Sequence, residues 1–143
     1  MRALTHLGGA RVTILVALLL VLLGGDARQA GLIALAGNAM SHALVQVLKR
    51  TVARPRPCDY WGVPLALIEL PDPFSFPSGH SAAAFAVALP IAWDWPLLAP
   101  VVLGLASLVA VSRVTLRVHY PGDVFAGVLL GTGGFLAARA IIG

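Results

Sequence analysis

The sequence predicts an all-α transmembrane bundle of about five helices, and three observations support this fold class. The 143-residue chain is 59% hydrophobic and 11% charged, whereas a soluble domain has about 25% charged residues. Its apolar residues gather in five segments, at residues 10–25, 27–49, 78–93, 96–113 and 121–142. The charged residues lie at or between the segment ends, as expected where charge inside lipid is costly. The length suits a single domain, which we place over residues 1–143.

The first segment resembles the beginning of a signal peptide, because Arg2 and Arg11 precede a long apolar run. The residues that follow, Gly24-Gly25-Asp26-Ala27-Arg28, make a poor cleavage site. We therefore expect an uncleaved first helix at residues 10–25, followed by a tight turn.

The second segment is the most polar of the five. Four polar residues recur along it at steps of three or four, namely Asn38, His42, Gln46 and Lys49. Such steps place side chains on one helix face. For Asn38 and Gln46 we favour a buried hydrogen-bonding stripe between helices.

The last three segments begin with recognisable helix-start residues. Ser78 suits an N-cap, and Pro96 suits the first turn of the fourth helix. Pro121-Gly122-Asp123 opens the fifth. A full membrane span needs about 20 residues, so the first and third segments are short unless flanking residues extend them.

Polar residues concentrate in three fragments beside these segments. The fragments are Lys49 to Pro57, then Pro77-Ser78-Gly79-His80, and then Ser112-Arg113 with His119 and Asp123. Because successive spans alternate in direction, the ends of segments two and four lie on the same side as the starts of segments three and five. The topology therefore predicts one shared site.

These fragments resemble the three motifs of the type 2 phosphatidic acid phosphatase (PAP2) superfamily. The resembling residues are Lys49 with Arg56-Pro57, then Pro77-Ser78-Gly79-His80, and then Ser112-Arg113 with His119 and Asp123. A lone Pro-Ser-Gly-His would be a weak signal, but three motifs with matching order and spacing are specific. The resemblance implies a PAP2/haloperoxidase-like helical core and a membrane hydrolase of phosphate esters.

The resemblance assigns phosphate binding to Lys49, Arg56, Arg113, Ser78 and Gly79. The residue chemistry agrees, because arginine offers a two-pronged fork and lysine a compact charge to phosphate oxygens. A helix start presents free N–H groups to an anion, and glycine lets the backbone approach it closely.

The remaining motif residues suit transfer of a phosphoryl group. The resemblance implies that His119 is the nucleophile, Asp123 accepts a hydrogen bond from its other ring nitrogen, and His80 is the general acid. We see no carboxylate cluster for a metal and expect no cofactor. Only Arg56 has the motif spacing from Lys49, so we interpret the other loop cations, Arg50, Arg54 and Arg117, as headgroup or secondary substrate contacts.

The expected function is hydrolysis of a lipid phosphate or diphosphate through a phosphohistidine, without metal. Phosphatidic acid, phosphatidylglycerol phosphate and polyprenyl diphosphate all fit as substrates. Two alternatives stay open: a lipid phosphotransferase using the same site, and an inactive headgroup-binding protein. A haloperoxidase holding vanadate fits the motifs too, but those relatives are typically soluble.

Partners and location follow from the same pattern. We expect contacts with membrane lipids and a possible homo-oligomer, but no nucleic acid, because the cations form a local cluster rather than a broad basic face. Membrane members of the family typically have six helices, so we expect that the first, non-catalytic helix is missing. The cation-rich side would be cytoplasmic by the positive-inside rule, whereas the resemblance favours a bacterial-type inner membrane with the site facing the periplasm or exterior.

Overall fold

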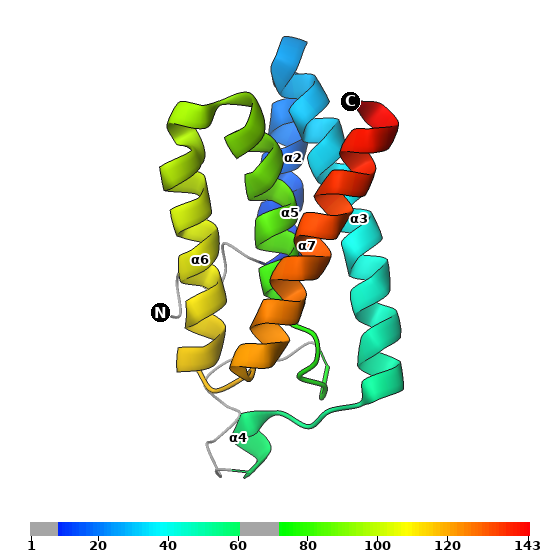
Figure 1. Ribbon diagram of the computed structural model, residues 1–143, viewed down its shortest axis with the longest axis vertical. Helices are drawn as coiled ribbons and strands as arrows, with labels where there is room; N and C mark the ends of the chain where they lie inside the picture. Colours follow the sequence, from blue (N-terminus) through cyan, green and yellow to red (C-terminus); the bar gives the residue numbers. More distant parts are fainter. Residues whose placement is uncertain (1–8, 61–71) are drawn as a thin grey trace.

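Helices make up the protein in the computed structural model, which describes residues 9–60 and 72–143 (Figure 1). Their order is α2 (Ala10–Leu23), α3 (Gly25–Val52), α4 (Pro57–Tyr60), α5 (Gly79–Asp94), the 3-10 helix η2 (Pro96–Leu98), α6 (Ala99–Thr115) and α7 (Pro121–Ile142). The five long helices confirm the predicted all-α class and the five predicted segments. Arg2, on which the signal-peptide argument partly rested, lies outside the described residues.

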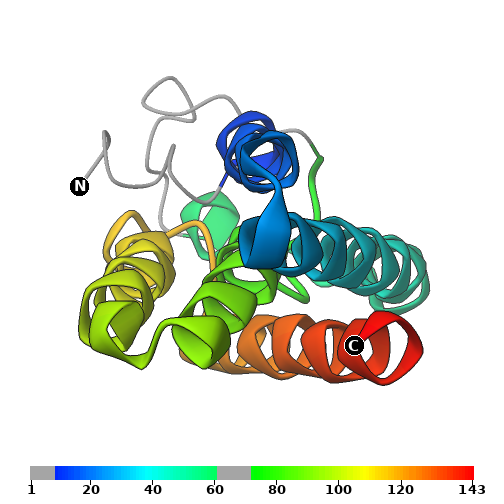
Figure 2. The ribbon, with the colours of Figure 1, turned by 90° about the horizontal axis from the view of Figure 1, so that it is seen from above.

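Helix α5 occupies the centre of the bundle. It packs against α3, α6 and α7 and touches α2 along one edge, and the view from above shows it between these neighbours (Figure 2). Helix α5 therefore lies next to α3, α6 and α7, and the ends of these three helices carry or adjoin the other predicted site residues.

The surface of the bundle suits lipid. Large apolar side chains such as Leu19, Leu22 and Leu97 are exposed, while the core clusters are built mainly of alanine with some valine. Three segments within the described residues are long and apolar enough to cross a membrane: Gly25–Val52, Pro96–Thr115 and Pro121–Ile142. Helices α2 and α5, with 14 and 16 residues, are shorter, as predicted for the first and third segments.

Glycines bring α7 into backbone contact with its neighbours. A Cβ atom added to Gly127 would overlap the carbonyl oxygen of Ser78, and one on Gly131 would overlap that of Ala82. Gly134 meets Gly37 of α3 in the same way. Close approach through small residues is the usual packing of helices in lipid, and here it fixes the start of α5 against α7.

The turn between α2 and α3 is a sharp one. Gly24 and Gly25 have φ values of 78° and 53°, which only glycine adopts at no steric cost. The predicted tight turn is confirmed, although α3 already begins at Gly25.

The predicted buried stripe on α3 holds for only part of its length. Asn38 is buried and its Nδ2 donates to Oγ1 of Thr13, 3.5 Å away. The prediction is wrong for Gln46, whose Nε2 lies 3.2 Å from Nε2 of His42 in an exposed contact. Lys49, one turn further on, is buried again.

Candidate active site

The three motifs meet at one end of the bundle, as the alternating topology predicts. The end of α3, the start of α5, the end of α6 and the start of α7 all lie at the end near α4 (Figure 1). Six of the eight predicted site residues are buried there: Lys49, Arg56, Ser78, Arg113, His119 and Asp123. The other two, Gly79 and His80, are partly buried.

The spacing of the third motif reflects a tight loop between α6 and α7. The backbone N–H groups of Val118 and His119 both donate to the carbonyl oxygen of Arg113, at 3.2 Å. Arg117 closes the turn with a φ of 57°. Five residues between Arg113 and His119 are thus what the chain needs to return over the end of α6.

The start of α7 holds Asp123 in place. Its Oδ2 accepts a hydrogen bond from the N–H of Tyr120 at 2.8 Å, which caps the helix. Its carbonyl oxygen accepts one from the N–H of Ser78 at 2.9 Å. The second and third motifs are therefore joined through the backbone.

Ser78 and Gly79 form the start of α5. The Ser78 hydroxyl oxygen accepts from the Ser81 hydroxyl at 2.9 Å and from the Ser81 N–H at 3.4 Å, which confirms the predicted N-cap. A Cβ on Gly79 would lie 3.6 Å from Cγ1 of Val45, an ordinary contact. The protein's own packing therefore does not require glycine there, and the role of Gly79 in phosphate binding stays a prediction.

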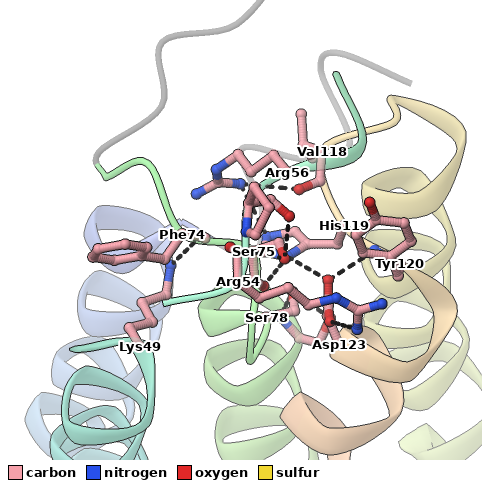
Figure 3. A network of polar contacts seen from close by, with 12 residues as sticks. Lys49, Arg54, Arg56, Phe74, Ser75, Ser78, Val118, His119, Tyr120 and Asp123 are labelled. Atoms are coloured by element: carbon pink, nitrogen blue, oxygen red, sulfur yellow. Dashed lines mark hydrogen bonds and ion pairs between the residues drawn. The ribbon is translucent and has the colours of Figure 1, made fainter. Parts of the chain in front are cut away.

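The two ring nitrogens of His119 face different neighbours (Figure 3). Nδ1 lies 2.6 Å from the carbonyl oxygen of Ser75 and 3.8 Å from Oδ2 of Asp123. Because both neighbours are acceptors, we place the hydrogen on Nδ1. Nε2 then carries the lone pair, and Nη1 of Arg56 lies 3.5 Å from it.

Two predicted phosphate ligands share an acid that the sequence did not single out. The Lys49 ammonium donates to both carboxylate oxygens of Asp72, at 2.8 and 2.7 Å, and to the carbonyl of Phe74. Arg56 donates to Oδ1 of Asp72 at 3.2 Å and to the Asp72 carbonyl at 3.0 Å. Asp72 stands outside the three motifs, so no spacing rule could have found it.

Arg54 also belongs to the site. Its Nη1 donates to Oδ1 of Asp123 at 3.0 Å, and its guanidinium lies over the Tyr120 ring, 4.0 Å from the centroid. Its carbonyl accepts from the N–H of Ser75 at 2.8 Å. The sequence did not predict this contact with Asp123, and the interpretation of Arg54 as a headgroup or secondary substrate contact stays a prediction.

The electrostatics favour a neutral histidine among cations. Burial lowers the pKa of His119 to about 4; the contact with the Asp123 carboxylate, 3.8 Å away, opposes this shift, while the charges of Arg56, Arg113 and Lys49 add to it. For Asp72, burial raises the pKa, but the hydrogen bond and charge of Lys49, with the charge of Arg56, bring it below its usual value. His119 is thus uncharged and Asp72 ionised at neutral pH.

The remaining motif residues lie within electrostatic range of these groups. Arg113 interacts with the charge of Arg56, and His80 interacts with Arg113, His119, Lys49 and Arg56. Within residues 9–60 and 72–143, no group of three or more His, Cys, Asp or Glu side chains is placed to hold a metal ion. Such a group of cations beside a neutral imidazole can bind an anion.

The sequence is similar to those of known phosphatases. Residues 30–142 match the PAP2 superfamily. The chain is 39% identical over 134 residues to the decaprenylphosphoryl-5-phosphoribose phosphatase of Mycobacterium tuberculosis, an alignment that covers 91% of this chain and 72% of that protein. It is 33% identical over 120 residues to an undecaprenyl-diphosphatase of Sulfolobus acidocaldarius, covering 79% of this chain and 55% of that protein.

A solved structure of a PAP2-type phosphatase shares the fold of this chain. The transmembrane PAP2-type phosphatidylglycerolphosphate phosphatase of Bacillus subtilis superposes with a TM-score of 0.77 at 30% identity, over 99% of this chain and 74% of that one. The apolar helices and this transmembrane relative agree on an integral membrane protein. The chain is a membrane phosphatase that belongs to the PAP2 superfamily.

Proposed function

We propose that this phosphatase hydrolyses a lipid- or polyprenyl-linked phosphate through a phosphohistidine on His119, without a metal ion. The observation that carries the proposal is the placement of the His119 ring. Nδ1 is held by the Ser75 carbonyl at 2.6 Å, and Nε2 faces Arg56. The imidazole therefore offers a lone pair beside a cation that can bind the oxygens of the attacked phosphorus.

The first chemical step forms a bond between Nε2 of His119 and phosphorus. The ester P–O bond breaks, and the leaving oxygen takes a proton from His80, whose protonated form is stabilised by the negative charge of the bound phosphate. Lys49, Arg56 and Arg113 balance the charge on the equatorial oxygens. Asp123 stabilises the positive charge that develops on the imidazole, by the logic of a histidine–aspartate pair.

The second step returns the enzyme to its starting state. A water molecule gives its proton to His80 and attacks phosphorus, and the bond between Nε2 of His119 and phosphorus breaks. Inorganic phosphate leaves, and the alcohol has already departed. The positive side chains occupy the place that metal ions fill in many phosphoryl-transfer enzymes, which is the reason for proposing a metal-independent reaction.

The substrate class follows from the setting and from the relatives. The site lies at one end of a bundle whose sides are apolar, so a lipid tail stays in the bilayer while its headgroup reaches His119. The relatives are named for decaprenylphosphoryl-5-phosphoribose, undecaprenyl diphosphate and phosphatidylglycerolphosphate. A phosphate carried by a polyprenyl lipid is therefore our first candidate, with the site on the periplasmic or outer face of the inner membrane.

The test is phosphate release by the purified full chain in detergent. The panel holds a polyprenyl-linked phosphosugar, a polyprenyl diphosphate, phosphatidylglycerol phosphate and phosphatidic acid, each with EDTA present. We expect release by the wild type and none by His119→Gln, together with an acid-labile, base-stable phosphorylated protein in a rapid quench. Loss of activity in EDTA, or equal release by His119→Gln, would reject the mechanism.

A further inference from the structure

Asp72 lies between two of the predicted phosphate ligands. Its carboxylate is shared by the Lys49 ammonium and by Nη2 of Arg56. The side chains of Lys49 and Arg56 are 7% and 2% exposed, whereas that of Asp72 is 24% exposed. The acid therefore covers the two cations, which we call the cation pair, from the outer side.

Asp72 also fixes which edge of Arg56 faces the nucleophile. Nε and Nη2 of Arg56 both donate to the backbone carbonyl of Asp72, and Nη2 also donates to its carboxylate oxygen Oδ1. On the other edge, Nη1 donates to the Val118 carbonyl and lies 3.5 Å from Nε2 of His119. A guanidinium is planar and rigid, so holding one edge sets the direction of the other. With Asp72 on its far edge, Arg56 presents Nη1 at the position where a phosphoryl group on His119 would lie.

The same acid holds the short segment that orients His119. Oδ1 of Asp72 accepts from the N–H of Phe74 at 3.0 Å, and the Phe74 carbonyl accepts from Lys49 at 3.2 Å. The next residue, Ser75, supplies the carbonyl that faces Nδ1 of His119. One carboxylate therefore ties together the cation pair and the backbone behind the nucleophile.

We propose that Asp72 is a positioning residue of the phosphatase reaction, which directs Nη1 of Arg56 toward the phosphoryl group and serves as the counter-anion of the cation pair. This inference rests on the proposed function of His119 and Arg56. As a counter-anion, Asp72 weakens the hold of the cation pair on free phosphate, because like charges repel. The site then releases its inorganic product instead of retaining it.

The decisive variant is Asp72→Asn, which removes the charge but keeps the shape and an acceptor oxygen. Two quantities are measured on the full chain in detergent: kcat with a lipid phosphate, and the Kd of inorganic phosphate by calorimetric titration. We expect kcat to fall at least about tenfold and phosphate to bind about tenfold more tightly. If Asp72 had only a structural role, its replacement would weaken phosphate binding. Tighter binding therefore distinguishes a counter-anion from a structural residue.

Asp72→Glu and Asp94→Asn complete the design. Asp72→Glu keeps the charge and shifts it, so we expect phosphate affinity within about twofold of the wild type but a lowered kcat. Asp94 pairs with Arg139 at 3.7 Å, outside the three motifs, and Asp94→Asn is expected to match the wild type in both quantities. Unchanged or weaker phosphate binding in Asp72→Asn, or an unchanged kcat in Asp72→Glu, would overturn the proposal.

The two proposals fail in different ways. If the wild type releases no phosphate from any lipid, the proposed function fails, and the phosphate titrations still decide whether Asp72 is the counter-anion of the cation pair. If the wild type is active and Asp72→Asn matches it in kcat and Kd, the function stands and the role of Asp72 is rejected.

Discussion

The carbonyl oxygen of Ser75 lies 2.6 Å from Nδ1 of His119, whereas the nearest oxygen of Asp123 lies 3.8 Å from the same nitrogen. The backbone of the segment before α5 therefore sets the tautomer of the histidine. Asp123 acts on it mainly through charge, and its oxygens accept hydrogen bonds from Arg54 and from the N–H of Tyr120.

Because Ser75 sets the tautomer and Asp123 supplies charge, we expect Asp123→Asn to lower kcat only in part. The Ser75 carbonyl keeps the hydrogen on Nδ1, so the variant retains the reactive tautomer and loses only the stabilising charge. We expect kcat to fall by about 100-fold, short of the complete loss in His119→Gln. Steady-state kinetics on a lipid phosphate measures both. A complete loss in well-folded Asp123→Asn would show that Asp123, not Ser75, sets the tautomer.

Arg54 is expected to matter although it lies outside the motif spacing. Its side chain is the cationic partner of Asp123, which is fully buried, and removing it leaves that carboxylate without a balancing charge. We expect Arg54→Ala to lower kcat by about tenfold and Arg54→Lys to restore part of it.

The matched control is Arg50→Ala, which is exposed in the last turn of α3, just before the same loop. It is expected to match the wild type, because the change removes the same charge type without touching Asp123. Equal losses in Arg50→Ala and Arg54→Ala would mean that general attraction of the anionic substrate, not the contact with Asp123, explains the effect.

The sequence predicted the helices and the grouping of the motifs, because apolar segment length and alternating direction depend on local composition alone. It placed Lys49, Arg56 and His119 at one end of the bundle for the same reason. It could not identify Asp72 or Ser75, since their roles depend on how the segment before α5 folds back over the chain after α3. An antiparallel bridge between Pro55 and Phe74 holds the two segments together, and no periodic pattern in the sequence predicts it.

Two features of the side-chain placement were missed for similar reasons. Gln46 shares a helical spacing with the buried Asn38 but is only partly buried and contacts His42 of its own helix, because a stripe of that period drifts around a helix axis. Arg54 repeats the Arg-Pro pair of Arg56, and only the folded loop shows that both side chains enter the site. Spacing along a chain identifies shared faces of helices well and contacts of irregular loops poorly.

Packing at the start of α5 is expected to be sensitive to one methyl group. In Gly127→Ala the new Cβ overlaps the Ser78 carbonyl and lies 3.0 Å from Cβ of Ser81, and backbone cannot yield as a flexible side chain does. We expect a loss of stability of about 1–3 kcal/mol and a lower kcat, because the displaced Ser78 begins the helix that faces the phosphate. Thermal unfolding in detergent and steady-state kinetics measure the two effects.

Gly133→Ala on the same helix is the control. Nothing lies within 4 Å of a Cβ at Gly133, so the same methyl group is added to α7 without a clash. We expect wild-type activity and an unchanged or slightly raised stability. If both variants lose activity alike, flexibility of α7 rather than its contact with Ser78 is responsible.

Finally, His119 is expected to stay neutral well below the usual pH of histidine titration. Burial and the neighbouring cations lower its pKa from 6.5 to about 4, so the folded protein binds fewer protons than the unfolded chain between these two values. The contribution of His119 to stability is therefore complete above pH 6.5 and is lost as the pH falls toward 4. In ¹³C-histidine NMR, we expect the His119 ring signal, assigned by its absence in His119→Gln, to keep its neutral shift from pH 8 to pH 5. A midpoint near 6.5 would contradict both the burial of the ring and its readiness as a nucleophile.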